Sequence, residues 1–157
     1  MKPKVYLETS IISYLAARPN RDLVVAAHQQ ITAEWWDKSR RRFDLYTSEL
    51  VIREAGAGDP KAAARRLEFL AGLHGLTIDE GALSLAKVLV ESGAVPLQAA
   101  EDALHIAMAT MNGMDFLLTW NCKHIANAAM WPRIDAVCRA QGYDPAAIAT
   151  PEQLAEE

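Results

Sequence analysis

The sequence predicts an α/β protein whose short strands are separated by helices and form one parallel sheet of four to five strands. Short apolar runs alternate with helical patterns along the chain, which is the order that βαβ units produce. The 157 residues are 51% hydrophobic and 23% charged, which is ordinary for a globular protein. Because repeats and long linkers are not evident, we expect one domain over residues 1–157.

In the first half of the chain, three apolar runs are predicted strands: KVYL at 4–7, DLYTS at 44–48 and LTI at 76–78. Helical patterns lie between and around them, at 11–17, 22–41, 49–57 and 59–72. The last of these has the clearest ends, because Asp59 is a favourable N-cap, Pro60 occupies the first helical position and Gly72 follows the helix.

The second half of the chain continues the alternation. A helix is predicted over 79–93, and another over 96–113 has Pro96 near its start and Gly113 at its end. DFLLT at 115–119 is the fourth predicted strand. A helical region over 122–142 is expected to break at Trp131-Pro132, and 146–154 contains a possible edge strand.

Charge and cysteine content narrow the classes of function. The formal net charge of −4 gives no overall attraction to nucleic acid, so such a role would depend on local basic groups at 38–42 and 61–66, which are equally typical of solvated helices. Cys122 and Cys138 do not form a secreted disulfide pattern, and Cys122 with His124 is too small a set for zinc. Since no apolar run approaches the ~20 residues of a membrane span, we expect a cytoplasmic protein.

Four side chains with oxygen ligands follow predicted strands. Glu8 ends the first strand, Glu54 lies in the helix after the second, Asp102 lies in the first turns of the 96–113 helix, and Asn121 follows the fourth strand. In an open parallel sheet the carboxyl ends of the strands meet at the point where the strand order reverses. These residues can therefore converge on one site, although they come from four distant segments.

Clustered carboxylates repel one another and are stable mainly beside a cation. Oxygen ligands of this kind suit Mg²⁺ or Mn²⁺, which can activate water and stabilise charge on a phosphodiester. Each residue also has a local explanation. Glu8 and Asp102 can interact with a helix dipole, Glu54 can be a solvated helix acid, and Asn121 can cap the next helix. Composition and spacing leave both interpretations open.

The same residues resemble those of the PIN-domain family, in particular the VapC-like toxin ribonucleases of toxin–antitoxin pairs. Members of the family open with a strand that ends in an acid followed by Thr or Ser, here Glu8-Thr9-Ser10. Their second acid matches Glu54 in TSELVIREAGAGDP. Their third begins a helix like AEDALHIAMA and matches Asp102, and their fourth matches Asn121 in LLTWNCKHI. The resemblance extends from residue 5 to the closing IATPEQL.

The resemblance implies a three-layer α/β/α fold, a bound Mg²⁺ or Mn²⁺ and cleavage of RNA. It further implies a homodimer and a cognate antitoxin. Glu8, Glu54, Asp102 and Asn121 would be both the catalytic residues and the metal ligands. The family usually has Asp at the places of Glu8 and Asn121, and Asn121 offers an oxygen without charge. The alternative is therefore a PIN-fold module that binds nucleic acid or protein with a weakened catalytic site.

Other residues are assigned smaller roles. Ser10 and Thr119 have hydroxyls that can orient ligands or water, or can simply cap strand ends. Arg53 is expected to hold the RNA backbone. Trp120 can stack on a base, with internal packing as its alternative. His105 is expected to be a hydrogen-bonded core histidine rather than part of the site. A phosphatase of the Asp-x-Asp type is disfavoured because LETSI has no second acid.

Overall fold

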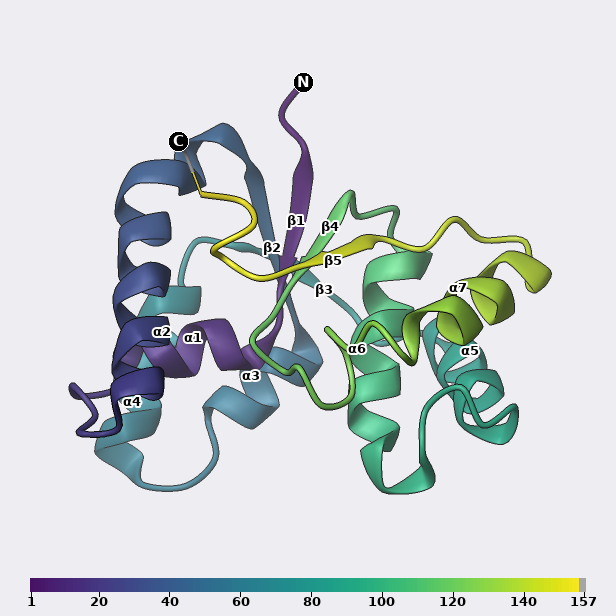
Figure 1. Cartoon of the computed structure of the whole chain (residues 1–157), viewed down its shortest axis with the longest axis horizontal. Coiled ribbons are helices and arrows are strands. Elements are labelled where there is room, and N and C mark those ends of the chain that lie inside the picture. The colour runs from purple at the N-terminus through teal and green to yellow at the C-terminus, as the bar shows by residue number, and fades with distance from the viewer. Residues whose placement is uncertain (156–157) are drawn as a thin grey trace.

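Residues 1–155 are described by a computed structural model, in which strands and helices alternate along the chain (Figure 1). The strands are β1 (Lys4–Leu7), β2 (Asp44–Ser48), β3 (His74–Leu76), β4 (Phe116–Leu118) and β5 (Ala147–Ala149). The α-helices are α1 (Thr9–Ala16), α2 (Leu23–Glu34), α3 (Glu49–Ala55), α4 (Pro60–Leu70), α5 (Glu80–Glu91), α6 (Ala100–Met111) and α7 (Trp131–Ala140). Within residues 1–155, no helix combines the length and the apolar character needed to cross a membrane.

The five strands form one parallel sheet in the order β3-β2-β1-β4-β5. The chain adds β2 and β3 on one side of β1 and then returns to add β4 and β5 on the other side. The strand order therefore reverses between β1 and β4, which is where ligands bind in open α/β sheets. Register partners such as Tyr6 and Leu117 align the two strands so that their carboxyl ends lie together.

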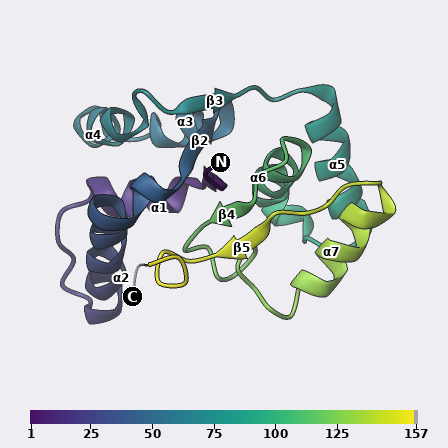
Figure 2. The same ribbon diagram turned by 90° about the horizontal axis from the view of Figure 1, so that it is seen from above.

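Helices cover both faces of the sheet, as the predicted three-layer α/β/α arrangement requires. Figures 1 and 2 show α1, α2 and α4 on one side and α5, α6 and α7 on the other. Val5, Tyr6 and Leu7 of the central strand β1 have no exposed surface, because both faces of that strand are covered. A strand buried on both faces accepts an unbroken apolar run, and this explains why KVYL was recognisable in the sequence.

The third strand lies two residues earlier than predicted, at His74–Leu76 instead of 76–78. Pairing with β2 sets this register, because Ser48 is aligned with Leu76. Beyond Leu76 the chain leaves the sheet. The backbone N–H of Ile78 donates to Glu49 Oε2 at 3.2 Å, and Asp79 caps α5 through the N–H of Ala82. The apolar pattern alone did not reveal these competing contacts.

The helical region predicted over 122–142 is also corrected, because only Trp131–Ala140 is an α-helix. Pro132 lies in the first turn of α7, where its missing N–H costs nothing, so it begins the helix instead of interrupting one. The preceding residues form turns held by the Asn127 side chain, whose Oδ1 accepts the N–H of Ala129 at 3.0 Å.

The helix predicted over 22–41 is α-helical only as far as Glu34. It continues through a π-helical turn, Trp35–Ser39, and a 3₁₀ turn, Arg40–Arg42. The wider turn buries the Trp35 ring against Phe43, with 5.9 Å between ring centroids. Trp36 packs instead on the edge of Phe69. The two adjacent rings thus have different partners, with Trp35 buried and Trp36 partly exposed, whereas the π-helical and 3₁₀ turns were not predicted from the regular 3.6-residue period.

Candidate functional site

Glu8 directly follows β1 at the point where the strand order reverses. Its backbone N–H donates to the carbonyl of Leu118 at 3.0 Å, so the pairing of β1 with β4 continues one residue past the strand. The side chain is only 6% exposed, and its Oε2 accepts the N–H of Ser10 at 3.1 Å. Glu8 therefore caps α1, as the local interpretation allowed, and at the same time holds a carboxylate at the reversal point of the sheet.

Two hydroxyl groups hold the Glu8 carboxylate in place. Ser10 Oγ and Thr119 Oγ1 both donate to Oε1, the latter at 2.6 Å. Each hydroxyl oxygen in turn accepts a backbone N–H from the segment after β4, from Trp120 at 2.8 Å and from Asn121 at 2.9 Å. The predicted supporting residues Ser10 and Thr119 thus both contact Glu8 and connect it to the chain that follows β4.

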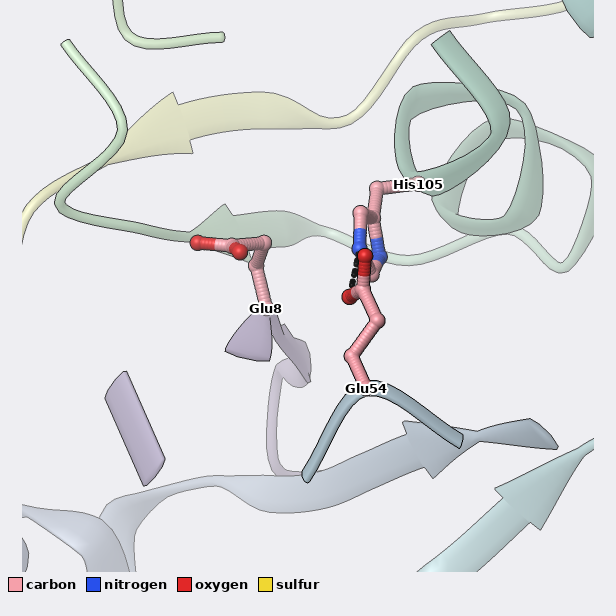
Figure 3. A group of neighbouring side chains, drawn as sticks. All are labelled: Glu8, Glu54 and His105. Atoms are coloured by element: carbon pink, nitrogen blue, oxygen red, sulfur yellow. Dashed lines mark hydrogen bonds and ion pairs between the residues drawn. The ribbon is translucent and has the colours of Figure 1, made fainter. Parts of the chain in front are cut away.

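Glu54 of α3 approaches Glu8 from the neighbouring strand connection and contacts His105 of α6 (Figure 3). Its Oε1 lies 2.7 Å from His105 Nε2 and accepts the Thr9 hydroxyl at 2.5 Å. Ligating atoms of Glu8, Glu54 and His105 all lie within 4.8 Å of one another. Two of the predicted acids therefore come together, and the third member of this group is a histidine.

The environment of Glu54 favours its ionised form. Burial alone would raise the pKa of this carboxyl group, but the hydrogen bond from His105 acts in the opposite direction. Hydrogen bonds from Thr9 and from the Glu101 carboxyl group add to this effect and lower the pKa of Glu54 to about 2. Glu54 therefore carries its charge over the whole neutral range.

A buried hydrogen-bonded chain lies behind His105. The Tyr6 hydroxyl is 2.7 Å from His105 Nδ1 and 2.8 Å from Ser48 Oγ. Burial raises the pKa of Tyr6 above its ordinary value. The hydrogen bond from Ser48 lowers this pKa, whereas the charges of Glu8 and Glu54 raise it further. The prediction that His105 is a hydrogen-bonded core histidine is confirmed, since it is 1% exposed. The same contacts also make it a neighbour of the site.

The two acids at the start of α6, Glu101 and Asp102, contact different partners. Asp102 Oδ2 is 3.2 Å from Nδ1 of His124, and within residues 1–155 Asp102 is not part of the group formed by Glu8, Glu54 and His105. Glu101, directly before it, hydrogen-bonds Glu54. This bond, followed by burial and by the charge of Glu54, raises the pKa of Glu101.

Glu101 was not among the residues predicted for the site. The sequence did contain an indication of its position, because Glu101 precedes His105 by four residues, and this spacing places two side chains on the same face of a helix.

Asn121, the fourth predicted ligand, makes a local contact. Its Oδ1 accepts the backbone N–H of His124 at 3.0 Å and so stabilises the turn that follows β4. The local interpretation expected Asn121 to cap a helix beginning near Cys122; the side chain accepts a backbone N–H in that way, but the segment it closes is a turn and not a helix. The same turn presents the His124 ring to Asp102, so the third and fourth predicted ligands are connected through His124.

The two residues predicted to contact RNA, Trp120 and Arg53, lie on different segments of the chain. The Trp120 ring stacks on His28 with 4.0 Å between centroids and 11° between planes, and its Nε1–H donates to Thr32 Oγ1 at 2.7 Å. One face of the indole is thus occupied within the protein. Arg53 is exposed in the last turn of α3, and its charge reaches Glu101.

No family sequence model and no curated protein sequence matches this chain, whereas several solved structures do. One is VapBC2 from Rickettsia felis bound to a DNA fragment from their promoter, with a TM-score of 0.60 and 14% identity over 93% of this chain and 97% of that one. Another is VapC20 from Mycobacterium tuberculosis, a sarcin–ricin loop cleaving toxin, with a TM-score of 0.60 and 15% identity over 76% and 92%. VapBC-1 from nontypeable Haemophilus influenzae matches with a TM-score of 0.58 and 18% identity over 94% and 98%.

The protein has a VapC-like PIN-domain fold. The match spans nearly the whole of the VapBC2 and VapBC-1 chains, so it covers both halves of the sheet and the reversal point between β1 and β4. The resemblance noted in the sequence is thereby confirmed at the level of the fold.

The residues at the reversal point of this VapC-like fold fit a divalent cation. Glu54 and Glu101 are close enough for one carboxyl group to donate a hydrogen bond to the other, which raises the pKa of Glu101. Glu8 lies beside Glu54 with its own carboxylate buried. Carboxylates this close repel one another, and a bound cation can relieve the repulsion in place of a shared proton. A set of ligands rich in carboxylate oxygen suits Mg²⁺ or Mn²⁺.

Proposed function

We propose that this protein is a metal-dependent endoribonuclease that cleaves RNA phosphodiester bonds, and that it is the cytoplasmic toxin of a toxin–antitoxin pair. We take residues 1–157 as a single PIN-like domain. The observation that carries the proposal is the meeting of Glu8 and Glu54 at the strand-order reversal of a VapC-like fold. One protein with this fold, VapC20, is a toxin that cleaves the sarcin–ricin loop.

In this proposal Glu8, Glu54 and Asp102 hold Mg²⁺ or Mn²⁺, and Asn121 completes the set with an uncharged oxygen. A bound ion would supply an activated water and would stabilise charge that develops on the phosphate. The chain's own hydroxyls at Ser10 and Thr119 keep Glu8 oriented through the hydrogen bonds described above.

The substrate-binding residues lie outside this set of ligands. Arg53 is exposed beside Glu54 and is proposed to bind an RNA phosphate. Trp120 is proposed to offer the indole face that His28 does not cover to a base.

The test is cleavage of RNA by the purified protein with Mg²⁺, with Mn²⁺ and with a chelator. We expect activity only with metal, and we expect Glu8→Gln, Glu54→Gln and Asp102→Asn each to lower the rate by about 10²-fold or more, because each removes a charge beside the reacting phosphate. Glu68→Gln is the matched control, since Glu68 is an exposed acid on α4. Full activity in Asp102→Asn would remove Asp102 from the mechanism, and activity in the chelator would refute a metal requirement.

A cognate antitoxin and a second copy of this chain are the proposed protein partners. The similar structures from Rickettsia felis and Haemophilus influenzae are both VapBC structures. Co-expression with a small protein encoded beside this chain, followed by purification and light scattering, tests both expectations. Separation of the two proteins during purification would contradict the antitoxin assignment, and the mass of a single chain would contradict the homodimer.

A second candidate is a binding module that keeps the fold but has a weakened catalytic site. The local contact of Asn121 with the N–H of His124 favours it, because this side chain has a structural use that needs no metal. Titration calorimetry with Mn²⁺ separates the candidates, since a binding module need not bind metal at millimolar concentration. Asn121→Asp keeps an oxygen for the N–H of His124, so the fold should tolerate it. A gain of cleavage in Asn121→Asp would favour the second candidate for the natural chain.

A further inference from the structure

We propose that His105 is a positioning residue for Glu54 and not a metal ligand. With Tyr6 and Ser48 it forms a buried hydrogen-bonded chain that fixes one oxygen of the Glu54 carboxylate. The role as a positioning residue for a metal ligand rests on the function proposed above. The direction of the hydrogen bonds and the position of the imidazole protons follow from the contacts of these side chains together with the cost of a buried unpaired hydroxyl proton, and do not depend on the proposed function.

The members of the chain come from three elements that meet under the site. Tyr6 lies on the central strand β1, Ser48 ends β2 and caps α3, and His105 lies on α6. All three side chains are at most 1% exposed, so water does not compete for their hydrogen bonds. A buried hydroxyl proton without an acceptor loses its hydrogen bond to water and gains none in return, so each proton should have an acceptor.

The direction of the hydrogen bonds from Ser48 through Tyr6 to His105 follows from the contacts of Ser48. Ser48 Oγ accepts the N–H of Val51 at 3.2 Å, and its other hydrogen-bond neighbour among residues 1–155 is the Tyr6 hydroxyl at 2.8 Å. The Ser48 proton must therefore be donated to Tyr6. Tyr6 then donates its own proton to His105 Nδ1 at 2.7 Å, since each hydroxyl has only one proton.

The imidazole protons are placed by the same reasoning. Nδ1 accepts from Tyr6 and so carries no proton, whereas Nε2 carries one and donates it to Glu54 Oε1 at 2.7 Å. In this arrangement neither ring nitrogen has a free lone pair for a metal ion. Although His105 lies within 4.8 Å of Glu8 and Glu54, its chemistry is that of a hydrogen-bond donor to a ligand.

The consequence for Glu54 is an asymmetric carboxylate. The proton from His105 and the hydroxyl proton of Thr9 are both donated to Oε1, and neither is donated to Oε2. One oxygen is thus held from two directions, which limits rotation of the group, and a cation at the carboxylate would replace the hydrogen bond from the Glu101 carboxyl group. Such outer hydrogen bonds typically change metal affinity by 10–100-fold.

Nitrogen-15 NMR of the histidine ring tests the proton positions directly. We expect His105 to show a proton on Nε2 and a bare Nδ1 in the metal-free protein, and to keep this pattern when Mg²⁺ is added, because the hydrogen bonds of the ring are undisturbed. Mg²⁺ is diamagnetic and does not broaden the signals. Loss of the Nε2 proton on addition of Mg²⁺ would show that His105 is a ligand and would overturn the proposal. A proton on Nδ1 in the metal-free protein would also overturn it.

Matched tyrosine variants test the effect on metal binding. Tyr6→Phe removes the hydroxyl that holds the ring, whereas Tyr46→Phe, at the register partner of Tyr6 on β2, removes a hydroxyl without a hydrogen-bond partner among residues 1–155. By calorimetry we expect Tyr6→Phe to bind Mn²⁺ about tenfold more weakly than the wild type and Tyr46→Phe to bind it equally well. Equal affinity in the two variants, with both folded by circular dichroism, would refute positioning through Tyr6.

Substitutions of His105 itself distinguish donation from packing. His105→Gln can still donate an N–H to Glu54, whereas His105→Leu cannot, so Gln should recover Mn²⁺ affinity lost in Leu. An affinity no better in Gln than in Leu would contradict the proposed role. If the wild-type protein binds no metal, the metal requirement and the positioning role both fall. A proton on Nδ1 together with normal Mn²⁺ binding would overturn this inference alone.

Discussion

Replacing Thr119 by valine should destabilise the fold by removing one hydroxyl without changing the shape of the side chain. Thr119 is fully buried, donates to the Glu8 carboxylate at 2.6 Å and accepts the N–H of Asn121 at 2.9 Å. A hydrogen bond to a charged group contributes about 1.5–3 kcal/mol, so we expect the free energy of unfolding to fall by about 2–3 kcal/mol. For a chain of this length that corresponds to a decrease in Tm of about 4–12 °C.

Thr47→Val is the matched control for this experiment. Thr47 is also a buried threonine at the end of a strand, but within residues 1–155 its Oγ1 has no hydrogen-bond partner. Removing an unpaired buried hydroxyl should leave stability unchanged or raise it. Urea unfolding at pH 7 in chelator measures both variants. Equal midpoints for Thr119→Val and Thr47→Val would refute the argument, as would an undiminished effect of Thr119→Val in a Glu8→Gln background.

Three further changes test other contacts. Glu54, whose pKa is lowered to about 2, stabilises the metal-free fold above the ordinary carboxyl pKa of about 4.5. That contribution disappears as the pH falls towards 2, so between pH 5 and pH 2 the wild type should lose up to about 3 kcal/mol more than Glu54→Gln in urea unfolding. Trp120→Phe removes the 2.7 Å bond to Thr32 and should lower the unfolding free energy by about 1 kcal/mol; an unchanged urea midpoint would contradict this. Asp59→Ala removes the 2.9 Å hydrogen bond that caps the N–H of Ala62 and should lower the unfolding free energy by about 1 kcal/mol in the same assay. The helical circular dichroism signal of the folded protein should change little.

Local signals in the sequence were sufficient for most of the elements. The apolar run at 4–7 and the strand at 44–48 match β1 and β2 residue for residue, and Asp59 with Pro60 begins α4 as predicted. These features depend on local properties of the chain: a short apolar run, an N-cap and a fixed proline φ angle. Where a distant partner decided the outcome, as it did for β3 and its pairing with β2, the prediction was wrong by two residues.

The candidate site likewise has residues that the sequence predicted and contacts that it did not predict. Glu8 and Glu54 were recognisable because each follows a predicted strand, and parallel strands bring such positions together. The contact of Asp102 with His124 and the hydrogen bond between Glu101 and Glu54 were not predicted from the sequence. These contacts depend on how α6 and the turn after β4 are rotated against the sheet, and packing across both segments sets that rotation.

By itself, the sequence determined an α/β fold, its central buried strand and the acids that follow the strands, because these are properties of local pattern and residue type. The tertiary structure alone decided which atoms meet. It placed His105 and its buried partner Tyr6 behind Glu54, because β1 and α6, which are nearly one hundred residues apart, pack against each other. A hydrogen bond at 2.7 Å depends on the orientation of both groups, and the periodicity of one segment does not contain that information.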